Sequence, residues 1–199
     1  LPIGLKLGTP DEATRKRNIE TTLRAIDATR PLNPLAWDLH LEKNDGSEET
    51  GIEWQDACLL SLNELKAGGA EPARIGVETL EFDYTSTLPL LDATGFAATL
   101  DIGHVWYCGF DETYYLENIL PRAIGFHMHG FNEVRDHKSL HFIPTERIKH
   151  FLDAVSARPN AAQLPVVLEV FSENSFHPSM EVLNELASTF PMEGSERTR

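Results

Sequence analysis

The sequence is poor in cysteine, in basic residues and in long hydrophobic runs. Its two cysteines, Cys58 and Cys108, form no Cys-x-x-Cys pair, so we expect free, buried thiols rather than a disulfide framework. The 17 Lys and Arg residues stand against 31 Asp and Glu residues, which gives a net charge of −14. Because nucleic-acid binders place basic side chains against phosphates, stable nucleic-acid binding is not expected, and a small-molecule substrate fits better.

No apolar run reaches the roughly 18 residues that a transmembrane helix needs, so no membrane span is expected. The first 17 residues have no basic start, apolar centre and small-residue cleavage site, and the pattern therefore predicts a cytoplasmic protein without a signal peptide. A chain of 199 residues with 41% hydrophobic content can bury one core. We expect a single domain over residues 1–191 and a frayed tail over residues 192–199.

Strand-like and helix-like segments alternate along the chain. Apolar runs predict strands at residues 35–41, 74–82, 96–102, 123–128 and 165–171. Helical periodicity predicts helices at residues 9–29, 54–67, 88–94, 113–120 and 145–155, and a last helix that carries Val182, Leu183 and Leu186. Nearly continuous apolar strands between helices favour the α/β class, with a parallel sheet that helices cover.

Two helix starts have sequence signals. Thr9 is predicted to cap the first helix, with Pro10 at the first helical position and Glu12 completing a capping box. Thr145 is predicted to cap a later helix.

About five strand–helix units are too few to close an eight-stranded barrel, which typically needs around 250 residues. We therefore expect a (β/α)8 TIM barrel that lacks its first three strands in this chain. The alternative is a complete, doubly wound sheet of five strands.

Histidines and carboxylates gather at the ends of the predicted strands. Residues 97–137 contain four of the eight histidines. The candidate metal ligands in this stretch are Asp101, His104, His127, His129, Asp136 and His137. Active sites of α/β barrels lie at the carboxyl ends of the strands, and imidazole with carboxylate suits zinc, manganese or iron.

Further candidates lie in the other strands. Glu78 and Glu169 are flanked by apolar residues, and burying them without a cation or hydrogen-bond partners would be costly. His40 ends the first predicted strand. His127 and His129 are two residues apart on one strand and are expected to face the same way. The structural alternatives are a salt bridge for either glutamate, a core position for His40 and a supporting hydrogen bond for one of the paired histidines.

Other residues are expected to have no role in such a site. His141, His150 and His177 are expected on the surface, and Trp37 and Trp54 in the core. Trp106 is also expected to pack in the core, although it lies close enough to the candidate ligands to line the pocket of a planar substrate.

Short motifs give the chain a family resemblance. LKLGTPDEATRKRNIE (residues 5–20), VETLEF, LDIGH, FHMHG, RDH and LEVF resemble, in this order, metal-site segments of the endonuclease IV-like superfamily (apurinic-site endonuclease family 2). That superfamily includes apurinic-site endonucleases, xylose-isomerase-like isomerases and epimerases, and cobamide-remodeling phosphodiesterases. The DIGH and HMHG motifs, the DH-x-SL loop of Asp136, His137, Ser139 and Leu140, and the LEVFS motif most resemble the cobamide-remodeling branch.

The resemblance implies a metal-dependent barrel with more than one divalent ion of zinc, manganese or iron. The positions that match its metal ligands are His40, Glu78, Asp101, His104, His127 or His129, His137 and Glu169. Two features depart from the family pattern. Asp136 and His137 are adjacent, where the endonucleases carry Asp-x-His, and a histidine that the family carries just before the position of Leu1 has no counterpart here.

Three functions remain open. In a phosphodiesterase acting on a small cofactor such as a cobamide, two or three ions would activate water and polarise the phosphoryl group. In a sugar-phosphate isomerase or epimerase, one ion would orient the substrate while Glu78 and Glu169 move a proton as the catalytic pair. The third function is non-enzymatic binding of a metal or cofactor. The candidate set holds more histidines than one ion needs as ligands. This surplus favours the hydrolase, which would use two or three ions.

Overall fold

In the computed structural model, which describes residues 1–43 and 52–189, five strands form one parallel sheet. The strands are β1 (Trp37–Leu39), β2 (Ile75–Glu78), β3 (Ala97–Asp101), β4 (Ala123–Met128) and β5 (Val166–Leu168). All five lie within the predicted strand segments, and β4 has the predicted bounds.

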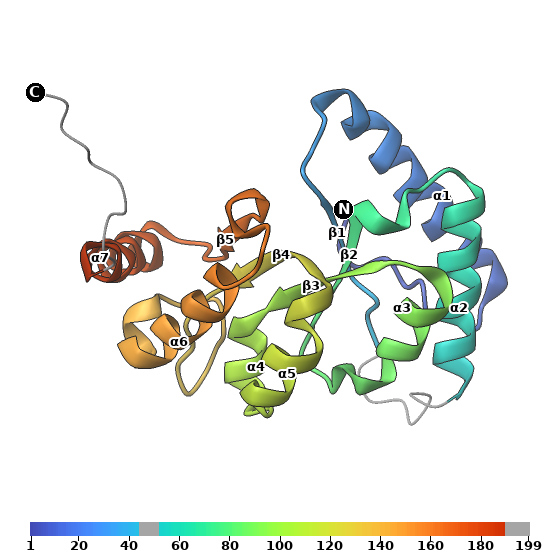
Figure 1. Ribbon diagram of the computed structural model, residues 1–199. Coiled ribbons are helices and arrows are strands. Elements are labelled where there is room, and N and C mark those ends of the chain that lie inside the picture. The colour runs from blue at the N-terminus through green and yellow to red at the C-terminus, as the bar shows by residue number, and fades with distance from the viewer. Residues whose placement is uncertain (44–51, 190–199) are drawn as a thin grey trace, which may run out of the picture.

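Each strand pairs with the next one along the chain, in the order β1-β2-β3-β4-β5, and every pairing is parallel. A doubly wound sheet would reverse its strand order at a switch point. The strands instead curl into an arc with β1 and β5 at its two ends (Figure 1). The structure is therefore part of a (β/α)8 barrel, as expected, and the doubly wound alternative is wrong.

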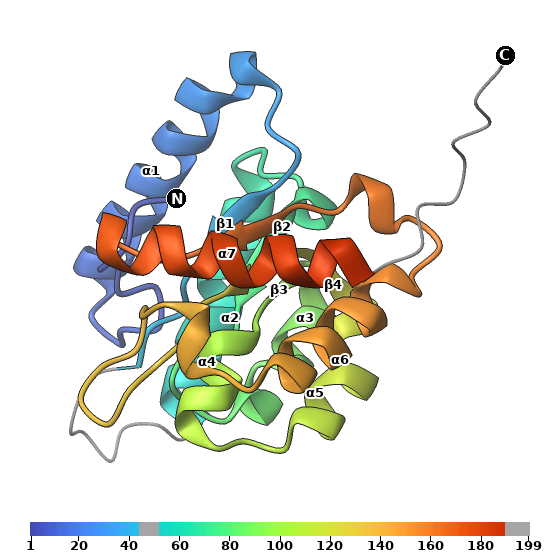
Figure 2. The same ribbon diagram turned by 90° about the vertical axis from the view of Figure 1, so that its left-hand side faces the viewer.

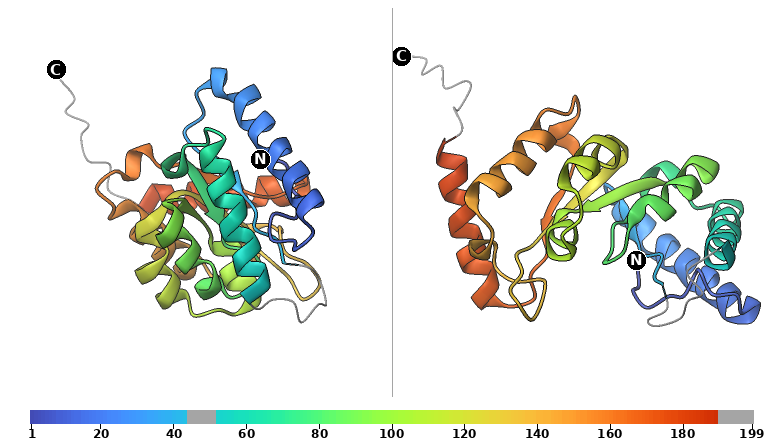
Figure 3. Two further views of the ribbon diagram at one scale, coloured as in Figure 1. Left: turned by 90° about the vertical axis from the view of Figure 1, so that its right-hand side faces the viewer. Right: turned by 90° about the horizontal axis from the view of Figure 1, so that it is seen from below.

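Helices cover the outer side of this arc (Figure 3). They are α1 (Glu12–Thr29), α2 (Ile52–Ala67), α3 (Leu88–Thr94), α4 (Ile102–Cys108), α5 (Glu112–Asn118), α6 (Thr145–Ser156) and α7 (Glu173–Thr189). The first helix packs against α2 at the β1 end, and α7 lies at the β5 end, where it is nearest the viewer in Figure 2. The side of the sheet away from the helices is thus the inside of the arc.

Both predicted caps are wrong. Asp11 caps α1, because its Oδ1 accepts the backbone N–H of Thr14 at 2.8 Å, while the Thr9 hydroxyl accepts only the N–H of Asp11. A carboxylate also interacts more favourably than a hydroxyl with the positive end of the helix dipole. Thr145 is the first residue of α6 and not its cap, a place that Pro144 takes without a side-chain hydrogen bond.

Two strand ends differ from the prediction. The chain turns directly from β3 into α4, so His104 lies in a helix rather than at a strand end. Glu169 follows the last residue of β5 instead of lying within the strand. Both side chains nevertheless stay at the carboxyl edge of the sheet.

The core fills the space between sheet and helices. Trp106, Phe126 and Phe151 are among its largest fully buried side chains, and Leu186 of α7 is buried as well. Cys58 is buried and Cys108 half-buried, and both are free, so the expectation of free thiols is confirmed and that of burial holds fully only for Cys58. No helix of residues 1–43 and 52–189 is long and apolar enough to cross a membrane. The expected tail, residues 192–199, lies outside the described residues.

A threonine ties two strands together where the candidate site begins. The Thr79 hydroxyl accepts the N–H of Asp101 at 2.9 Å and lies 3.2 Å from the carbonyl oxygen of the same residue. In addition, the Thr79 N–H donates to the carbonyl of Thr99 at 3.0 Å. The carboxyl ends of β2 and β3 are therefore held at a fixed separation by the protein alone.

Candidate metal centre

Side chains from four neighbouring strand ends converge at the carboxyl edge of the sheet. They are Glu78, the last residue of β2, Asp101, the last residue of β3, His127 in β4, and Glu169 directly after β5. One ligand atom of each lies within 4.8 Å of the others. We call these four residues the carboxylate set.

His127 lies between the two glutamates of this set. Its Nδ1 is 3.1 Å from Oε1 of Glu78 and 2.9 Å from Oε2 of Glu169. Register explains the arrangement, because His127 pairs with Asp101 of β3 on one side and with Val167 of β5 on the other. The strand pairing thus places His127 at the centre of the set.

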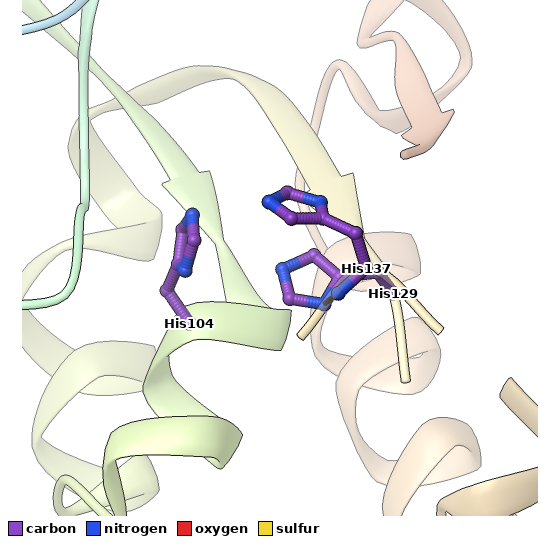
Figure 4. A group of neighbouring side chains, drawn as sticks. All are labelled: His104, His129 and His137. Carbon is purple, nitrogen blue, oxygen red and sulfur yellow. Dashed lines mark hydrogen bonds between the residues drawn. The ribbon is translucent and has the colours of Figure 1, made fainter. Parts of the chain in front are cut away.

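Three imidazoles form a second group beside the first, and we call His104, His129 and His137 the histidine set. His104 comes from α4 and faces the other two rings (Figure 4). The ring centroids of His129 and His137 are 4.1 Å apart, and that of His104 lies 5.0 Å from His129 and 5.3 Å from His137. Asp136 adjoins the set, with Oδ2 3.8 Å from His104 Nδ1 and 3.5 Å from His137 Nε2.

Asp101 links the two sets. Its Oδ1 caps α4 by accepting the N–H groups of Gly103 and His104 at 2.7 and 3.3 Å. Its Oδ2 lies 3.4 Å from Nε2 of His129 and 3.6 Å from Nε2 of His104. A Cβ on Gly103 would lie 2.4 Å from the His129 ring, so only glycine lets that ring approach. One carboxylate therefore starts a helix and joins both groups.

A third group forms around Glu78 from the other side. Nε2 of His40 is 2.7 Å from Oε2 of Glu78 and 3.6 Å from Oδ2 of Asp38. Ligand atoms of these three residues lie within 4.8 Å of one another, as do those of Glu81, His104 and Asp136. All nine residues predicted as metal ligands thus fall into four adjoining groups.

Asp38 and Glu81 were missed by the sequence reasoning. Asp38 lies two residues before His40, and side chains at that spacing on a strand share a face. Glu81 lies three residues after Glu78 in the same VETLEF motif. The spacing to a recognised candidate was the signal in both cases.

Several buried polar atoms in these groups have no hydrogen-bond partner. Among the described residues, the following buried atoms have no hydrogen-bond partner: Asp38 Oδ1, Asp101 Oδ2, His104 Nδ1, His129 Nε2, Glu169 Oε2 and Thr87 Oγ1. Buried polar atoms are nearly always paired, and all but the threonine oxygen belong to the groups above. Oxygen and nitrogen donors of this kind fit divalent cations such as zinc or manganese.

The electrostatics of the carboxylate set are those of a site that attracts positive charge. Burial lowers the pKa of His127, but its contacts with Glu169 and Glu78 outweigh burial and raise the pKa to about 11. Burial raises the pKa of Glu78, but hydrogen bonds with Asp38, His127 and His40 hold it well below its ordinary value. Burial and the neighbouring Glu78 raise the pKa of Asp38. In the metal-free protein, the proton on His127 takes the place of a cation.

The histidine set is electrostatically mixed. Burial lowers the pKa of His104, and the neighbouring His129 and His137 lower it further against the pull of Asp101. Burial also lowers the pKa of His129, but the contact with Asp101 outweighs it and raises the pKa. His104 is therefore neutral near pH 7 and has a lone pair to offer.

Backbone carbonyls orient two of these rings. Nδ1 of His137 lies 3.2 Å from the Glu169 carbonyl oxygen, and Nδ1 of His129 lies 3.0 Å from that of Gly130. When Nδ1 of His137 carries the proton and donates it, Nε2 of that ring is left free to bind a cation. In His129, the same Nδ1 accepts the backbone N–H of His137 at 3.1 Å.

The remaining predictions about single residues hold. His141, His150 and His177 are exposed, as expected. Trp106 is buried against Phe151, its ring centroid 6.3 Å away, and its Nε1 donates to Glu112. Its packing role is confirmed.

Comparison with known proteins identifies the fold. No protein-family model matches the chain, and no curated protein does so by sequence. Among solved structures, a D-tagatose 3-epimerase-like protein is similar with a TM-score of 0.73 and 16% identity, over 94% of this chain and 74% of that one. SacUVDE is similar with a TM-score of 0.66 and 15% identity, over 92% of this chain and 63% of its own length.

The IOLI protein, in a crystal structure with a bound zinc atom, has a TM-score of 0.61 and 10% identity, over 90% of this chain and 70% of that one. The chain thus spans less than two thirds of SacUVDE and about three quarters or less of the other two. Identities this low show the fold alone, and the fold of this chain is that of a TIM barrel, of which it forms part.

Proposed function

We propose that this chain belongs to a metal-dependent phosphodiesterase that acts on a small cofactor, with a cobamide as the first substrate to test. The observation that carries the proposal is the position of Asp101 Oδ2, an unpaired buried atom that lies between the carboxylate set and the histidine set. Two adjoining cation sites joined by one carboxylate are the arrangement that phosphoryl transfer uses.

The residues present suit such ions. The carboxylate set would hold one ion, and the histidine set with Asp136 a second. Bound there, the ions would polarise the phosphoryl oxygens and make a water molecule more acidic.

The chain's own groups divide the remaining work. Within the carboxylate set, the side chain of Glu169 is 26% exposed and that of Glu78 only 2%. Glu169 is therefore the carboxylate placed to accept a proton from a water molecule that enters from solvent. Glu78 stays ionised between His40 and His127 and holds both rings in place.

The choice of a cobamide rests on the resemblance of the DH-x-SL and LEVFS motifs to cobamide-remodeling phosphodiesterases. A surface feature agrees with it. Phe171 of the second motif is 76% exposed, and its ring centroid lies 4.7 Å from that of His137. An apolar ring at the edge of the centre suits the planar base that a cobamide nucleotide carries.

A second candidate is a sugar epimerase or isomerase. The observation that favours it is the pair of carboxylates from Glu78 and Glu169, which approach the same nitrogen of His127 within 3.1 and 2.9 Å. Such a pair could move a proton at a carbon next to a carbonyl while the carboxylate set holds one ion. The likeness to a D-tagatose 3-epimerase-like protein is consistent with this candidate.

The deciding experiment uses the full chain, stripped of metal and reloaded with zinc or manganese. Metal content per chain is measured first, and the loaded protein is then incubated with a cobamide and, separately, with ketoses. Release of a nucleoside or its phosphate, with two or more ions per chain, supports the phosphodiesterase. Epimerisation of a ketose, with one ion per chain, would instead support the epimerase or isomerase over the phosphodiesterase. Metal binding without either reaction would support a non-enzymatic binding protein. The variant Glu169→Gln should slow whichever reaction is seen by about 100-fold or more, and substitution of an exposed histidine in His150→Gln should not.

A further inference from the structure

The loop between β4 and α6 brings Asp136 and His137 to the centre in a backbone conformation that needs support. His137 has φ = 49°, in the left-handed region that residues other than glycine seldom adopt. Such a conformation persists only when the surroundings hold it in place. The contacts that hold this loop are therefore part of what shapes the histidine set.

One support is a backbone ladder at the base of the loop. Gly130 and Lys138 exchange two hydrogen bonds, with N–H to carbonyl distances of 2.7 and 2.8 Å. A Cβ on Gly130 would lie 2.0 Å from the carbonyl oxygen of Ser139, so glycine is required for this approach. The ladder ties the loop to the end of β4. His137 is held further by its own N–H, which donates to Nδ1 of His129 at 3.1 Å, and by its Nδ1, which lies 3.2 Å from the Glu169 carbonyl oxygen.

The second support comes from α7. The Leu140 N–H donates to the hydroxyl of Ser179 at 2.9 Å, and that hydroxyl lies 2.7 Å from the carbonyl oxygen of Ser175. The Ser139 hydroxyl lies 3.2 Å from the same oxygen of Ser179. Leu140 and Ser179 are fully buried, and Ser139 is 1% exposed, so water does not replace these bonds.

The geometry points to Ser179 as a positioning residue for the histidine set. We infer that its hydroxyl, by accepting the Leu140 N–H and donating to Ser175, holds the loop against α7 and so places His137 beside His104 and His129. Ser179 itself belongs to none of the ligand groups. This inference rests on the proposed metal centre. It concerns the histidine set in particular, because Glu78, Asp101 and His127 of the carboxylate set lie on β2, β3 and β4, outside this loop.

The test compares Ser179→Ala with Ser188→Ala by cobalt(II) titration of the metal-free full chain. Ser188 is an exposed serine of the same helix whose hydroxyl donates to the Glu185 carbonyl, so it controls for removing a hydroxyl from α7. Visible absorption follows cobalt entering the nitrogen-rich histidine set, and calorimetry gives the affinity of each site.

We expect Ser179→Ala to weaken cobalt binding to the histidine set by about tenfold or more, as is usual for residues that orient metal ligands. Binding to the carboxylate set should change by less than about twofold, and Ser188→Ala should match the unsubstituted chain at both sites. Equal weakening at both sites would mean a general structural role and overturn the inference, as would unchanged binding at the histidine set.

A metal-free measurement separates this inference from the proposed function. Ring resonances of His137 in the NMR spectrum of the metal-free chain should shift in Ser179→Ala while those of His40 stay in place, whether or not any ion binds. If Ser179→Ala fails to fold, Ser179→Thr retains the hydroxyl and should keep the His137 resonances of the unsubstituted chain. A shifted His137 signal in a folded Ser179→Thr chain would overturn the inference. Failure of the unsubstituted chain to bind cobalt counts against the metal centre instead.

Discussion

The backbone carbonyl of Glu169 lies 3.2 Å from Nδ1 of His137, while the carboxylate of the same residue lies 2.9 Å from Nδ1 of His127. Glu169 thus contributes its side chain to the carboxylate set and its main chain to the orientation of a ring in the histidine set. A substitution can separate these two functions, because it changes the side chain of Glu169 and leaves its backbone carbonyl in place.

Replacing Glu169 with Gln should therefore act on one set alone. We expect the affinity of the carboxylate set for zinc to fall and the reaction to slow by about 100-fold or more, the usual cost of losing a general base. The histidine set should keep its affinity, because the Glu169 carbonyl still orients His137. Calorimetric zinc titration and a rate assay check both statements. A loss of zinc affinity at both sets would contradict the separate functions of the Glu169 side chain and carbonyl.

Asp101→Asn should affect both sets but leave the fold stable. Asn caps helices about as well as Asp, so α4 should keep its start and the melting temperature should change little. The loss of a negative oxygen between the sets should weaken ion binding at each. Asp111, which caps α5 in the same manner, provides the matched control. Asp111→Asn should leave ion binding unchanged, and a similar loss of ion binding in that variant would show that the effect comes from capping.

The metal-free protein should lose stability as pH rises from 7 to 10. In the folded chain the pKa of His127 is raised from its ordinary 6.5 to about 11, so the folded state retains a proton that the unfolded state releases. The contribution of this proton is fully present below pH 6.5 and disappears as pH approaches 11, at a rate of about 1.4 kcal/mol per pH unit. The raised pKa values of His40 and His129 act in the same direction.

Thermal unfolding in the presence of a chelator measures this effect. The melting temperature should fall across the alkaline range, and the fall should be smaller in His127→Gln, which has no such proton. Loading with zinc should flatten the profile, because the ion replaces the proton among the carboxylates. A melting temperature of the metal-free chain that is constant from pH 7 to 10 would contradict the charge state inferred for His127.

Gly103→Ala should damage the centre through packing alone. The added Cβ would lie 2.4 Å from the His129 ring, and overpacking of this kind typically costs about 1–3 kcal/mol. We expect a lower melting temperature and weaker cobalt binding at the histidine set. Gly125→Ala is the control, because its Cβ would meet its nearest neighbour, Pro165, at an ordinary 3.7 Å. If the two substitutions lowered the melting temperature and cobalt binding equally, the contact between position 103 and the His129 ring would not be the cause.

Much of this architecture could be predicted from the sequence because strands and their carboxyl ends leave local signals. The apolar run at Ala123–Met128 has the bounds of β4, and the polar residues that follow such runs lie at the predicted edge of the sheet. The start of α4 was not recognised, because Asp-Ile-Gly-His after a strand looks like a strand end unless Asp101 is seen as a cap.

The division into sets required the structure. A period of two puts His127 and His129 on one face, yet the residues are separated by about 6.6 Å along the strand at roughly 3.3 Å per residue. That offset lets His127 join the carboxylates while His129 joins the other imidazoles. Asp38 was overlooked because a lone acid in an alternating strand is normally on a solvated face, whereas its pairing with Gly76 of β2 places it near Glu78.

The strap formed by Thr79 between β2 and β3 has a consequence for ion selectivity. Since these bonds set the gap between the main chains of Glu78 and Asp101, an arriving ion meets carboxylates whose attachment points were fixed during folding. Ions of different radius can draw the two carboxylates closer or push them apart only by rotating the side chains. Discrimination among divalent metals would then depend on which side-chain rotations these fixed attachment points allow.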